Sequence, residues 1–291
     1  MALIPLDDRD GSIWFDGKIV PWRDAKLHVL THALHYGSAA FEGERVYGGN
    51  VFKLTEHNER LHKSCKILAF EVPFSVEELD RATREVVSLN KIETGYVRPI
   101  AWRGSEVIGV SAKGTKIHVA IMAFPWPAYY TPEARLKGIR LKTSRWARPA
   151  PHCAPTNSKA AGLYMICTMS RDEANAAGYD DALMLDYRGQ VAEATGANLF
   201  LVINGELHTP TPDCFLDGIT RRTVMDLARQ RDIRIVERAI FPDELTQASE
   251  IFITGTAVEV VPISEIDGRK FAVGPMTIQL MQDYEKLVLA K

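Results

Sequence analysis

A lysine at the start of an apolar segment is the first residue whose position suggests covalent chemistry. Lys159 stands in the segment Ala154-Pro-Thr-Asn-Ser-Lys159-Ala-Ala-Gly-Leu-Tyr164, where an irregular loop runs into a helix that we expect over residues 160–177. The helix dipole disfavours a cation in the first turn, and burial lowers the pKa of an amine further. A neutral lysine is a nucleophile for carbonyl groups. Most lysines near helix starts are solvated, so the chemistry needs partners elsewhere in the chain.

A carboxylate among small residues is the second candidate. Glu193 lies in Gln190-Val-Ala-Glu193-Ala-Thr-Gly-Ala-Asn198-Leu-Phe-Leu-Val202, just before a predicted apolar strand. Burying a free carboxylate is costly, so we expect a partner for its charge. That partner is either a nearby arginine or backbone amides, or else the protonated nitrogen of a heterocycle.

Two segments have the composition of an anion-binding site. Leu216-Asp-Gly218-Ile219-Thr220-Arg-Arg222 leads through a glycine into a predicted helix, and Thr254-Gly255-Thr256-Ala257 follows a predicted strand. Backbone N–H groups and the helix dipole favour a phosphate at such places. Arg60 could supply the formal positive charge. Each segment alone is more typical of a helix cap or a turn.

Together these groups match one ligand. A reactive lysine suits an aldehyde, a carboxylate suits a ring nitrogen, and an anion site suits a phosphate. Pyridoxal 5′-phosphate carries all three groups, forms a Schiff base with a lysine, and uses its protonated ring to stabilise a carbanion. The sequence therefore predicts pyridoxal 5′-phosphate as the cofactor.

Other motifs predict no chemistry. The segment Gly109-Val-Ser-Ala-Lys-Gly114-Thr-Lys116 resembles a phosphate-binding loop, but Thr-Lys replaces Lys-Ser/Thr and no helix is expected after it. His28, His32 and His35 have helical spacing, but a complete metal-ligand set is missing, so we interpret them as structural. No metal is expected.

The composition excludes several classes of protein. The 291 residues are 46% hydrophobic and 25% charged, with a formal net charge of −2, as in an ordinary globular protein rather than a disordered chain. The charge balance argues against a nucleic-acid partner. No membrane span or secretory signal is expected. The 4 cysteines show no CxxC spacing, which predicts free thiols and a cytoplasmic location.

Periodicity and turn residues predict the elements of the first half. An Asp16-Gly17 turn predicts a hairpin over residues 13–20, and a helix is expected from Thr55, capped by Thr55 or Asn58. A capping box, Ser75-Val-Glu-Glu78, predicts a second helix to about residue 90. Strands are expected over residues 96–102 and 116–124.

The second half mixes strands and helices without a strict alternation, so we expect an α+β protein. Strands are predicted over residues 139–143, 181–186, 198–203, 234–240 and 250–254, and helices over 160–177 and 220–231. Prolines punctuate the chain after Trp126. The expected division is an N-terminal α+β domain over residues 1–126, an interdomain loop over 127–138, and a C-terminal domain over 139–291.

A series of motifs, in order along nearly the whole chain, resembles the class IV pyridoxal-phosphate aminotransferases, and among them the bacterial branched-chain amino-acid aminotransferases. The matching motifs are His32-Ala-Leu-His-Tyr-Gly37, Phe41-Glu-Gly43, Tyr96-Val-Arg98-Pro99, Phe124-Pro-Trp126, Asn157-Ser-Lys159-Ala, Glu193-Ala-Thr-Gly-Ala-Asn-Leu-Phe200, Gly218-Ile-Thr220 and Gly255-Thr256-Ala257-Glu. The resemblance implies the two-domain type IV fold, with a C-terminal pseudo-barrel and the cofactor between the domains.

The resemblance also implies roles for individual residues. Lys159 matches the Schiff-base lysine, Glu193 the carboxylate on the pyridine nitrogen, and Tyr164 the tyrosine that hydrogen-bonds the phenolic oxygen of the cofactor. The matching phosphate contacts are Arg60, Gly218, Ile219, Thr220 and Thr256.

The expected substrate pocket is mostly apolar and aromatic, as suits branched side chains. Its expected lining is Tyr36, Phe41, Tyr96, Val110, Trp126, Tyr129 and Tyr164; the alternative for these residues is plain core packing. Arg98 shares a strand face with Tyr96, and in the family the matching arginine binds the distal carboxylate of glutamate. Thr256 and Ala257 match the α-carboxylate site. Tyr36 and Val110 match positions that a neighbouring subunit contributes, which implies a homodimer or a larger assembly such as a hexamer.

The implied reaction is transamination of L-leucine, L-isoleucine and L-valine with 2-oxoglutarate, by ping-pong kinetics through an internal aldimine. Rivals are a D-amino-acid aminotransferase, an (R)-amine transaminase or an aminodeoxychorismate lyase of the same fold, and a catalytically silent scaffold. Glu44 and the 103–111 loop depart from the family pattern. We expect both near the substrate entrance, where they affect substrate range.

Overall fold

The protein has mixed α and β structure, which confirms the predicted fold class. The computed structural model describes residues 4–127 and 131–290 of the chain. The chain forms two compact units, the first comprising Met1–Pro127 with Ser158–Gly162, and the second comprising Ala128–Asn157 with Leu163–Lys291. The short segment that contains Lys159 thus belongs to the first unit, although it is distant in sequence from the rest of that unit.

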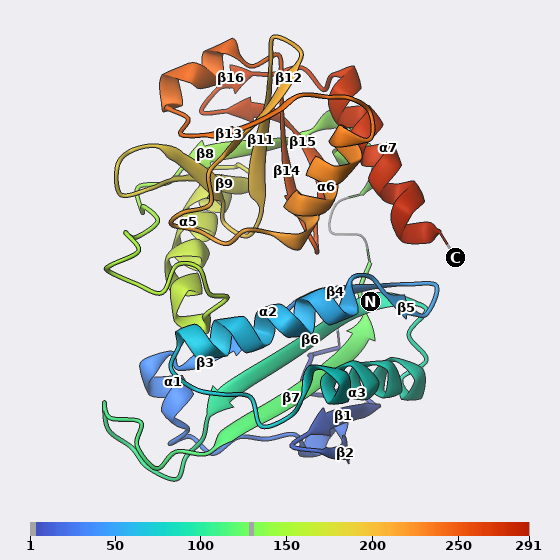
Figure 1. Ribbon diagram of the computed structural model, residues 1–291, viewed down its shortest axis with the longest axis vertical. Coiled ribbons are helices and arrows are strands. Elements are labelled where there is room, and N and C mark those ends of the chain that lie inside the picture. Colours follow the sequence, from blue (N-terminus) through green and yellow to red (C-terminus); the bar gives the residue numbers. More distant parts are fainter. Residues whose placement is uncertain (1–3, 128–130, 291) are drawn as a thin grey trace. The chain divides into compact units, whose positions relative to one another are not determined.

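A seven-stranded sheet forms the centre of the first unit, with the order β2-β1-β7-β6-β4-β5 and β3 paired with β6. Its strands are β1 (Ser12–Phe15), β2 (Lys18–Pro21), β3 (Ala39–Phe41), β4 (Glu44–Tyr47), β5 (Asn50–Val51), β6 (Thr94–Arg103) and β7 (Ile117–Pro125). The helices are α1 (His32–Tyr36), α2 (Leu54–Ile67) and α3 (Val76–Leu89), with a 3₁₀ turn at Trp22–Asp24. Figure 1 shows α2 and α3 lying along β6 and β7.

The two faces of this sheet differ in character, because successive side chains of a strand point to opposite faces. Val97, Ala101 and Ile121 belong to the buried core that includes residues of α2 and α3. Tyr96 and Arg98 alternate with Val97 and therefore lie on the other face. Phe41 of β3 pairs with Ile100 of β6, which places Phe41 on that face as well.

Two of the predicted local signals in the first unit are confirmed. Asp16 occupies the turn between β1 and β2 with a φ of 48°, as a tight hairpin requires. Ser75 and Glu78 form the predicted capping box of α3: the Glu78 N–H donates to Ser75 Oγ at 3.2 Å, and the Ser75 N–H donates to Glu78 Oε2 at 2.7 Å.

The predicted cap of α2 is wrong. The helix begins at Leu54 after Lys53, whose φ is 56°, and no side chain caps it. Thr55 and Asn58 instead donate to the carboxylate of Asp80 on α3, at 2.6 and 2.8 Å. These polar residues join two helices, a tertiary role that a local capping pattern does not reveal.

A nine-stranded sheet forms the second unit. Its strands are β8 (Ile139–Thr143), β9 (Asp181–Leu185), β10 (Val191–Ala194), β11 (Asn198–Ile203), β12 (Glu206–Pro210), β13 (Ile235–Arg238), β14 (Glu250–Gly255), β15 (Glu259–Ile266) and β16 (Arg269–Lys270). The helices are α4 (Pro132–Lys137), α5 (Tyr164–Ala176), α6 (Ile219–Arg229) and α7 (Pro275–Leu289), with 3₁₀ turns at Ala161–Leu163, which precedes α5, and Pro242–Gln247. Within the described residues, no helix is long and apolar enough to cross a membrane.

Six strands of this sheet close on themselves. The hydrogen-bonded path runs β10-β9-β8-β15-β14-β11, and β10 also pairs with β11, which completes a barrel. The closing pair is Glu193 of β10 with Asn198 of β11. Apolar side chains fill the unit, and α5, α6 and α7 pack against its strands (Figure 1).

Glu44 shares the sheet face of Val97, which packs with residues of α2 and α3, and not the face of Tyr96 and Arg98. It pairs with Val97 across β4 and β6, and its side chain is fully buried. Among the described residues, neither carboxylate oxygen has a hydrogen-bond partner. Burial, together with the nearby carboxylates of Glu42 and Asp80, raises the pKa of Glu44 well above its ordinary value. Burial of this carboxyl group therefore favours its uncharged form.

We predict that Glu44→Leu stabilises the protein by about 1–3 kcal/mol near neutral pH, because it removes a buried polar group without partners. A carboxyl whose pKa is raised in the folded state lowers the free energy of unfolding as the pH rises from its ordinary pKa to the raised value. The gain should therefore grow as the pH rises above the ordinary pKa of 4.5. Urea denaturation of wild type and variant across this pH range measures it.

Glu44→Gln is the matched control, since it keeps the polar group but cannot ionise. It should remove the pH dependence and give a smaller gain than Glu44→Leu. A Glu44→Leu protein that is less stable than wild type at every pH would contradict the interpretation of Glu44 as a destabilising neutral group.

Candidate functional site

The backbone around Lys159 is held on two sides within the first unit. The N–H of Phe41 donates to the carbonyl of Lys159 at 3.2 Å, and the N–H of Lys159 donates to Ser64 Oγ of α2 at 3.0 Å. Ala40 of β3 and Ala160 form a β-bridge. Lys159 is therefore fixed between a strand and a helix that are far from it in sequence.

The sequence predicted that Lys159 lies in the first turn of a helix, and this prediction is wrong. A 3₁₀ turn over Ala161–Leu163 follows it, and α5 begins at Tyr164. The helix-dipole effect, which requires a lysine in the first turn of a helix, therefore does not apply to Lys159. Its position beside β3 and α2 is the relevant constraint.

Two basic side chains lie against the same aromatic ring. Lys159 Nζ is 4.9 Å from the ring centroid of Phe41, and Arg98 Cζ is 4.7 Å from it. The guanidinium of Arg98 also lies 5.2 Å from the ring centroid of Tyr96, and it donates to the Tyr96 hydroxyl at 3.3 Å. The Nε–H of Arg98 is buried and has no hydrogen-bond partner among the described residues. An amine and an anion-binding group thus share one aromatic surface.

Arg60 is paired with a buried carboxylate. Its Nε and Nη2 donate to Glu42 Oε1 and Oε2 at 2.7 and 2.8 Å, and His57 Nδ1 lies 2.7 Å from Glu42 Oε2. Burial alone would raise the pKa of Glu42, but the charge of Arg60 and the hydrogen bonds of Arg60 and His57 outweigh it and lower that pKa. Burial lowers the pKa of His57. Glu42 and His57 were not singled out from the sequence.

Four other predicted pocket residues differ in their environments. Trp126 lies 6.1 Å from Tyr96 between ring centroids. Tyr36 and Val110 are exposed, at 45% and 85%. Tyr129 lies outside the described residues.

A second arginine, which the sequence did not predict as a site residue, lies on the same face of the sheet as Tyr96. Arg45 pairs with Tyr96 in the register of β4 and β6, and its side chain is buried. It lies 5.5 Å from the ring centroid of Tyr47. The alternation of residues along a strand could have placed it, had residues 44–47 been recognised as a strand.

In the second unit, Glu193 has the arginine partner that the sequence left as one alternative. Arg148 Nε lies 3.3 Å from Glu193 Oε1, and Asn198 Nδ2 donates to Glu193 Oε2 at 3.3 Å. Burial would lower the pKa of Arg148, but the carboxylate of Glu193 raises it.

Asn198 connects the predicted parts of the second unit, a role that no sequence pattern predicted. It pairs with Glu193 on one side and with Thr254 of β14 on the other. Its side chain also accepts from the N–H of Gly218 at 3.1 Å and donates to the carbonyl of Leu216 at 2.9 Å. Glu193 and the start of α6 are therefore held by one amide side chain.

The start of α6 has the geometry of an anion site. Gly218 precedes the helix, and no side chain caps it. A Cβ at this glycine would lie 2.2 Å from Asn198 Oδ1, so a larger residue cannot fit without displacing that amide. The first N–H groups of the helix, including those of Ile219 and Thr220, lack intrahelical partners by geometry.

The other predicted groups of this unit lie at the ends of elements. Thr256 and Ala257 occupy the turn between β14 and β15, just after Thr254. Tyr164 is the first residue of α5 and is partly buried.

One of the three histidines interpreted as structural, His32, is buried and has hydrogen-bond partners within the first unit. His32 Nδ1 lies 2.6 Å from Ser38 Oγ, and its Nε2 lies 2.9 Å from the carbonyl of Gly109, so the buried imidazole connects α1 to the loop after β6. No helix follows the Gly109–Lys116 segment, because β7 begins at Ile117. That segment is therefore not a phosphate-binding loop.

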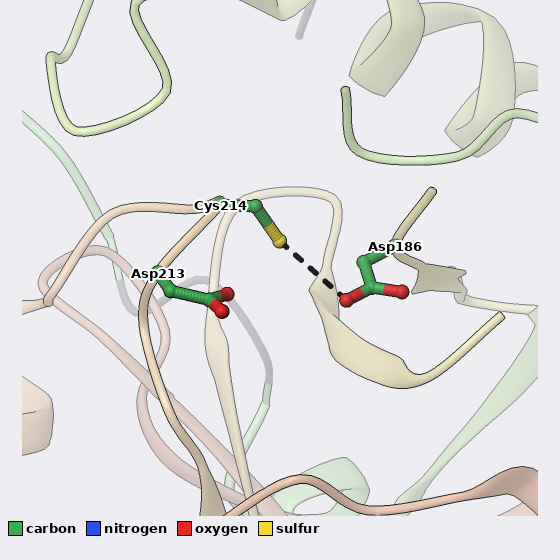
Figure 2. Close-up of side chains that lie close together, drawn as sticks. All are labelled: Asp186, Asp213 and Cys214. Carbon is green, nitrogen blue, oxygen red and sulfur yellow. Dashed lines mark hydrogen bonds between the residues drawn. The ribbon is translucent and has the colours of Figure 1, made fainter. Parts of the chain in front are cut away.

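One cluster in the second unit has the residue types of a metal site (Figure 2), namely Asp186, Asp213 and Cys214. Arg188 Nε donates to Asp186 at 2.8 Å, and its Nη2 donates to Asp213 at 2.9 Å. The Cys214 thiol donates to Asp186 at 3.8 Å, and burial raises its pKa to about 12. A guanidinium already balances the carboxylates, so the cluster has a structural explanation.

Comparisons with known proteins point to one family. Residues 39–266 match the family model described as amino-transferase class IV. The branched-chain-amino-acid aminotransferase of Pseudomonas aeruginosa is 44% identical over 293 residues, covering 98% of this chain and 95% of that protein.

Two solved structures of a branched-chain amino acid aminotransferase, both from the organism abbreviated T.th., are similar over most of the chain. The structure with pyridoxamine 5′-phosphate gives a TM-score of 0.93 at 40% identity, covering 97% of this chain and 95% of that chain. The structure complexed with N-(5′-phosphopyridoxyl)-L-glutamate gives a TM-score of 0.92 at 39% identity, with the same coverage.

Proposed function

Because the chain belongs to the class IV aminotransferase family, we propose that it transfers the amino group between branched-chain L-amino acids and 2-oxoglutarate, using pyridoxal 5′-phosphate. Names of similar proteins support the substrate class, and the neighbours with pyridoxamine phosphate and phosphopyridoxyl-glutamate support the cofactor and glutamate. The observation that carries the proposal is the placement of Lys159 Nζ and the Arg98 guanidinium against the ring of Phe41.

We assign the cofactor to residues of suitable chemistry in both units. In the first unit, Lys159 supplies the amine and Arg60 a positive charge for the phosphate. In the second, Glu193 offers a buried carboxylate for the ring nitrogen and Tyr164 a hydroxyl for the phenolic oxygen. The proposed phosphate contacts of the second unit are Gly218, Ile219, Thr220 and Thr256. When bound, the cofactor supplies a protonated ring that stabilises negative charge at the substrate Cα.

Lys159 also has the proposed role of moving the proton. Its Nζ would take the proton from the substrate Cα as a general base and give it back as a general acid. The hydrogen bonds of its backbone to Phe41 and Ser64 support this role, since a fixed backbone limits the positions of the amine.

Arg98 and Phe41 together address the need to accept two kinds of side chain. Phe41, Tyr96 and Trp126 provide apolar surface for leucine, isoleucine and valine. Arg98 provides a cation for the distal carboxylate of glutamate, and its buried Nε–H supports an anion as its partner. Thr256 and Ala257 are proposed to bind the α-carboxylate with backbone amides.

Arg98→Ala should reduce kcat/KM for glutamate and 2-oxoglutarate more than for leucine, by about 2–5 kcal/mol of transition-state binding if the charge pair is desolvated. The reason is that leucine makes no ion pair with the guanidinium. Steady-state assays with both amino donors measure the difference, and Lys159→Ala, which lacks the reacting amine, serves as the inactive control. Equal losses for both donors would contradict the role of Arg98, and near-normal turnover by Lys159→Ala would contradict the proposed function.

We propose that the protein is a homodimer or a larger homo-oligomer, to which one subunit contributes Tyr36 and Val110 near the substrate of its neighbour. Exposed apolar residues of α1 and the loop after β6 support this, namely Leu34 at 63% exposure, Ile108 at 52% and Val110 at 85%. The contact between His32 and Gly109 joins these two segments into one surface. Exposed apolar patches of this kind mark interaction sites.

Sedimentation velocity of the wild-type protein should give at least twice the mass of one chain. Leu34→Asp should shift the protein towards monomer, because it places a charge in the apolar surface. Glu59→Asp, at an exposed position on α2, is the control and should leave the mass unchanged. A wild-type protein that is monomeric at assay concentration and fully active would contradict the proposal.

Two broader expectations also stay proposals. The domain division at residues 126 and 139 is supported by the prolines and the change of periodicity there, and limited proteolysis is its check. A cytoplasmic location is supported by the absence of disulfides among the 4 cysteines, all of which are described and free, and cell fractionation is its check.

A further inference from the structure

We propose that Glu42 and His57 are positioning residues, which fix the guanidinium of Arg60 in the orientation that binds a 5′-phosphate. This inference rests on the proposed function, in which Arg60 contacts the phosphate of the cofactor. Neither residue needs to contact the cofactor, because each acts through Arg60.

Two parallel hydrogen bonds join the guanidinium of Arg60 to the carboxylate of Glu42. Arg60 Nε and Nη2 bond the two oxygens of Glu42 at 2.7 and 2.8 Å, and the Glu42 side chain is fully buried. Two parallel bonds between planar groups fix both the position and the plane of a guanidinium, whereas one bond permits rotation. Glu42 therefore determines the direction in which the remaining Arg60 donors point.

The carboxylate of Glu42 is itself held in place. The backbone N–H of Glu42 donates to the carbonyl of Pro99 on β6 at 2.8 Å, which attaches this residue to the sheet. His57 Nδ1 lies 2.7 Å from Glu42 Oε2, and both groups are at most 1% exposed. Because the pKa of Glu42 is lowered and the carboxylate is ionised, Nδ1 carries the proton and donates.

Helix α2 carries three of the residues that make these contacts. His57, Arg60 and Ser64 recur at spacings of three and four residues, so they lie on one helical face. Ser64 accepts the N–H of Lys159, while Arg60 and His57 bind Glu42, which directly follows β3. One helical face thus positions both the proposed phosphate ligand and the backbone of the reactive lysine.

An alternative role for Glu42 predicts the opposite change in phosphate affinity when its negative charge is removed. A carboxylate that merely balances the charge of Arg60 competes with a phosphate for it, so removing the negative charge should tighten phosphate binding. A positioning carboxylate should weaken phosphate binding when it is removed. The sign of the change in affinity therefore distinguishes the two roles.

The experiment measures equilibrium binding of pyridoxamine 5′-phosphate and of pyridoxamine to cofactor-free protein, by titration calorimetry. Glu42→Gln should weaken binding of the phosphorylated compound about tenfold or more, since one charge-assisted hydrogen bond of the fork is lost. Binding of pyridoxamine, which lacks the phosphate, should change little. Thermal melts of the cofactor-free proteins establish that each variant is folded.

His57 provides a second, independent pair of variants. His57→Asn keeps an N–H close to the position of Nδ1 and should retain phosphate affinity, whereas His57→Leu removes the donor and should lose it several-fold. If Glu42→Gln does not fold, this pair still decides the question. Equal behaviour of the two His57 variants, or tighter binding of the phosphorylated compound by Glu42→Gln, would overturn the inference.

Arg60→Ala separates this inference from the proposed function. If Arg60→Ala loses the preference for the phosphorylated compound and Glu42→Gln retains it, only the positioning role fails. If Arg60→Ala itself retains that preference, the assignment of Arg60 as a phosphate ligand fails, and the positioning role fails with it.

Discussion

The fixed backbone of Lys159 is the constraint on which the proposed chemistry depends. An amine that must reach a carbonyl carbon and then move a proton has to stay within a narrow range of positions. The chain achieves this by pairing residues 158–162 with β3 and α2, although more than ninety residues separate Lys159 from Ser64. The unit that contains the lysine is therefore completed by a segment from the middle of the sequence.

The two faces of the first sheet have different roles: one packs in the core, and the other carries proposed substrate-binding residues. Val97 and its neighbours pack against α2 and α3, whereas Tyr96, Arg98 and Phe41 lie on the opposite face. Because the alternation of a strand forces this division, one strand carries both core and site residues. The neutral Glu44 is an exception on the core face, where a polar group adds no contact that the structure describes.

Local signals in the sequence predicted local structure well. The hairpin at Asp16, the capping box at Ser75 and the strand over residues 198–203 depend on neighbouring residues, and each is confirmed. The predicted cap of α2 and the predicted helical position of Lys159 were wrong, because tertiary contacts with Asp80 and Ser64 determine them.

The sequence predicted the site residues whose side-chain type indicates a chemical role. It did not predict the residues that act by holding another side chain in place. Lys159, Arg60 and Glu193 are conspicuous as a potential nucleophile, cation and buried carboxylate. Glu42, His57 and Asn198 act through side-chain hydrogen bonds between segments far apart in sequence, and no spacing in the chain reveals those bonds. Charge compensation was foreseen for Glu193, but Arg148 as the partner required the fold.

The most direct test of the central claim is to locate the covalent bond between protein and cofactor. Wild-type protein loaded with pyridoxal 5′-phosphate is reduced with borohydride, digested, and mapped by mass spectrometry. The account predicts a phosphopyridoxyl group on Lys159. A label on another lysine, or no label at all, would contradict it.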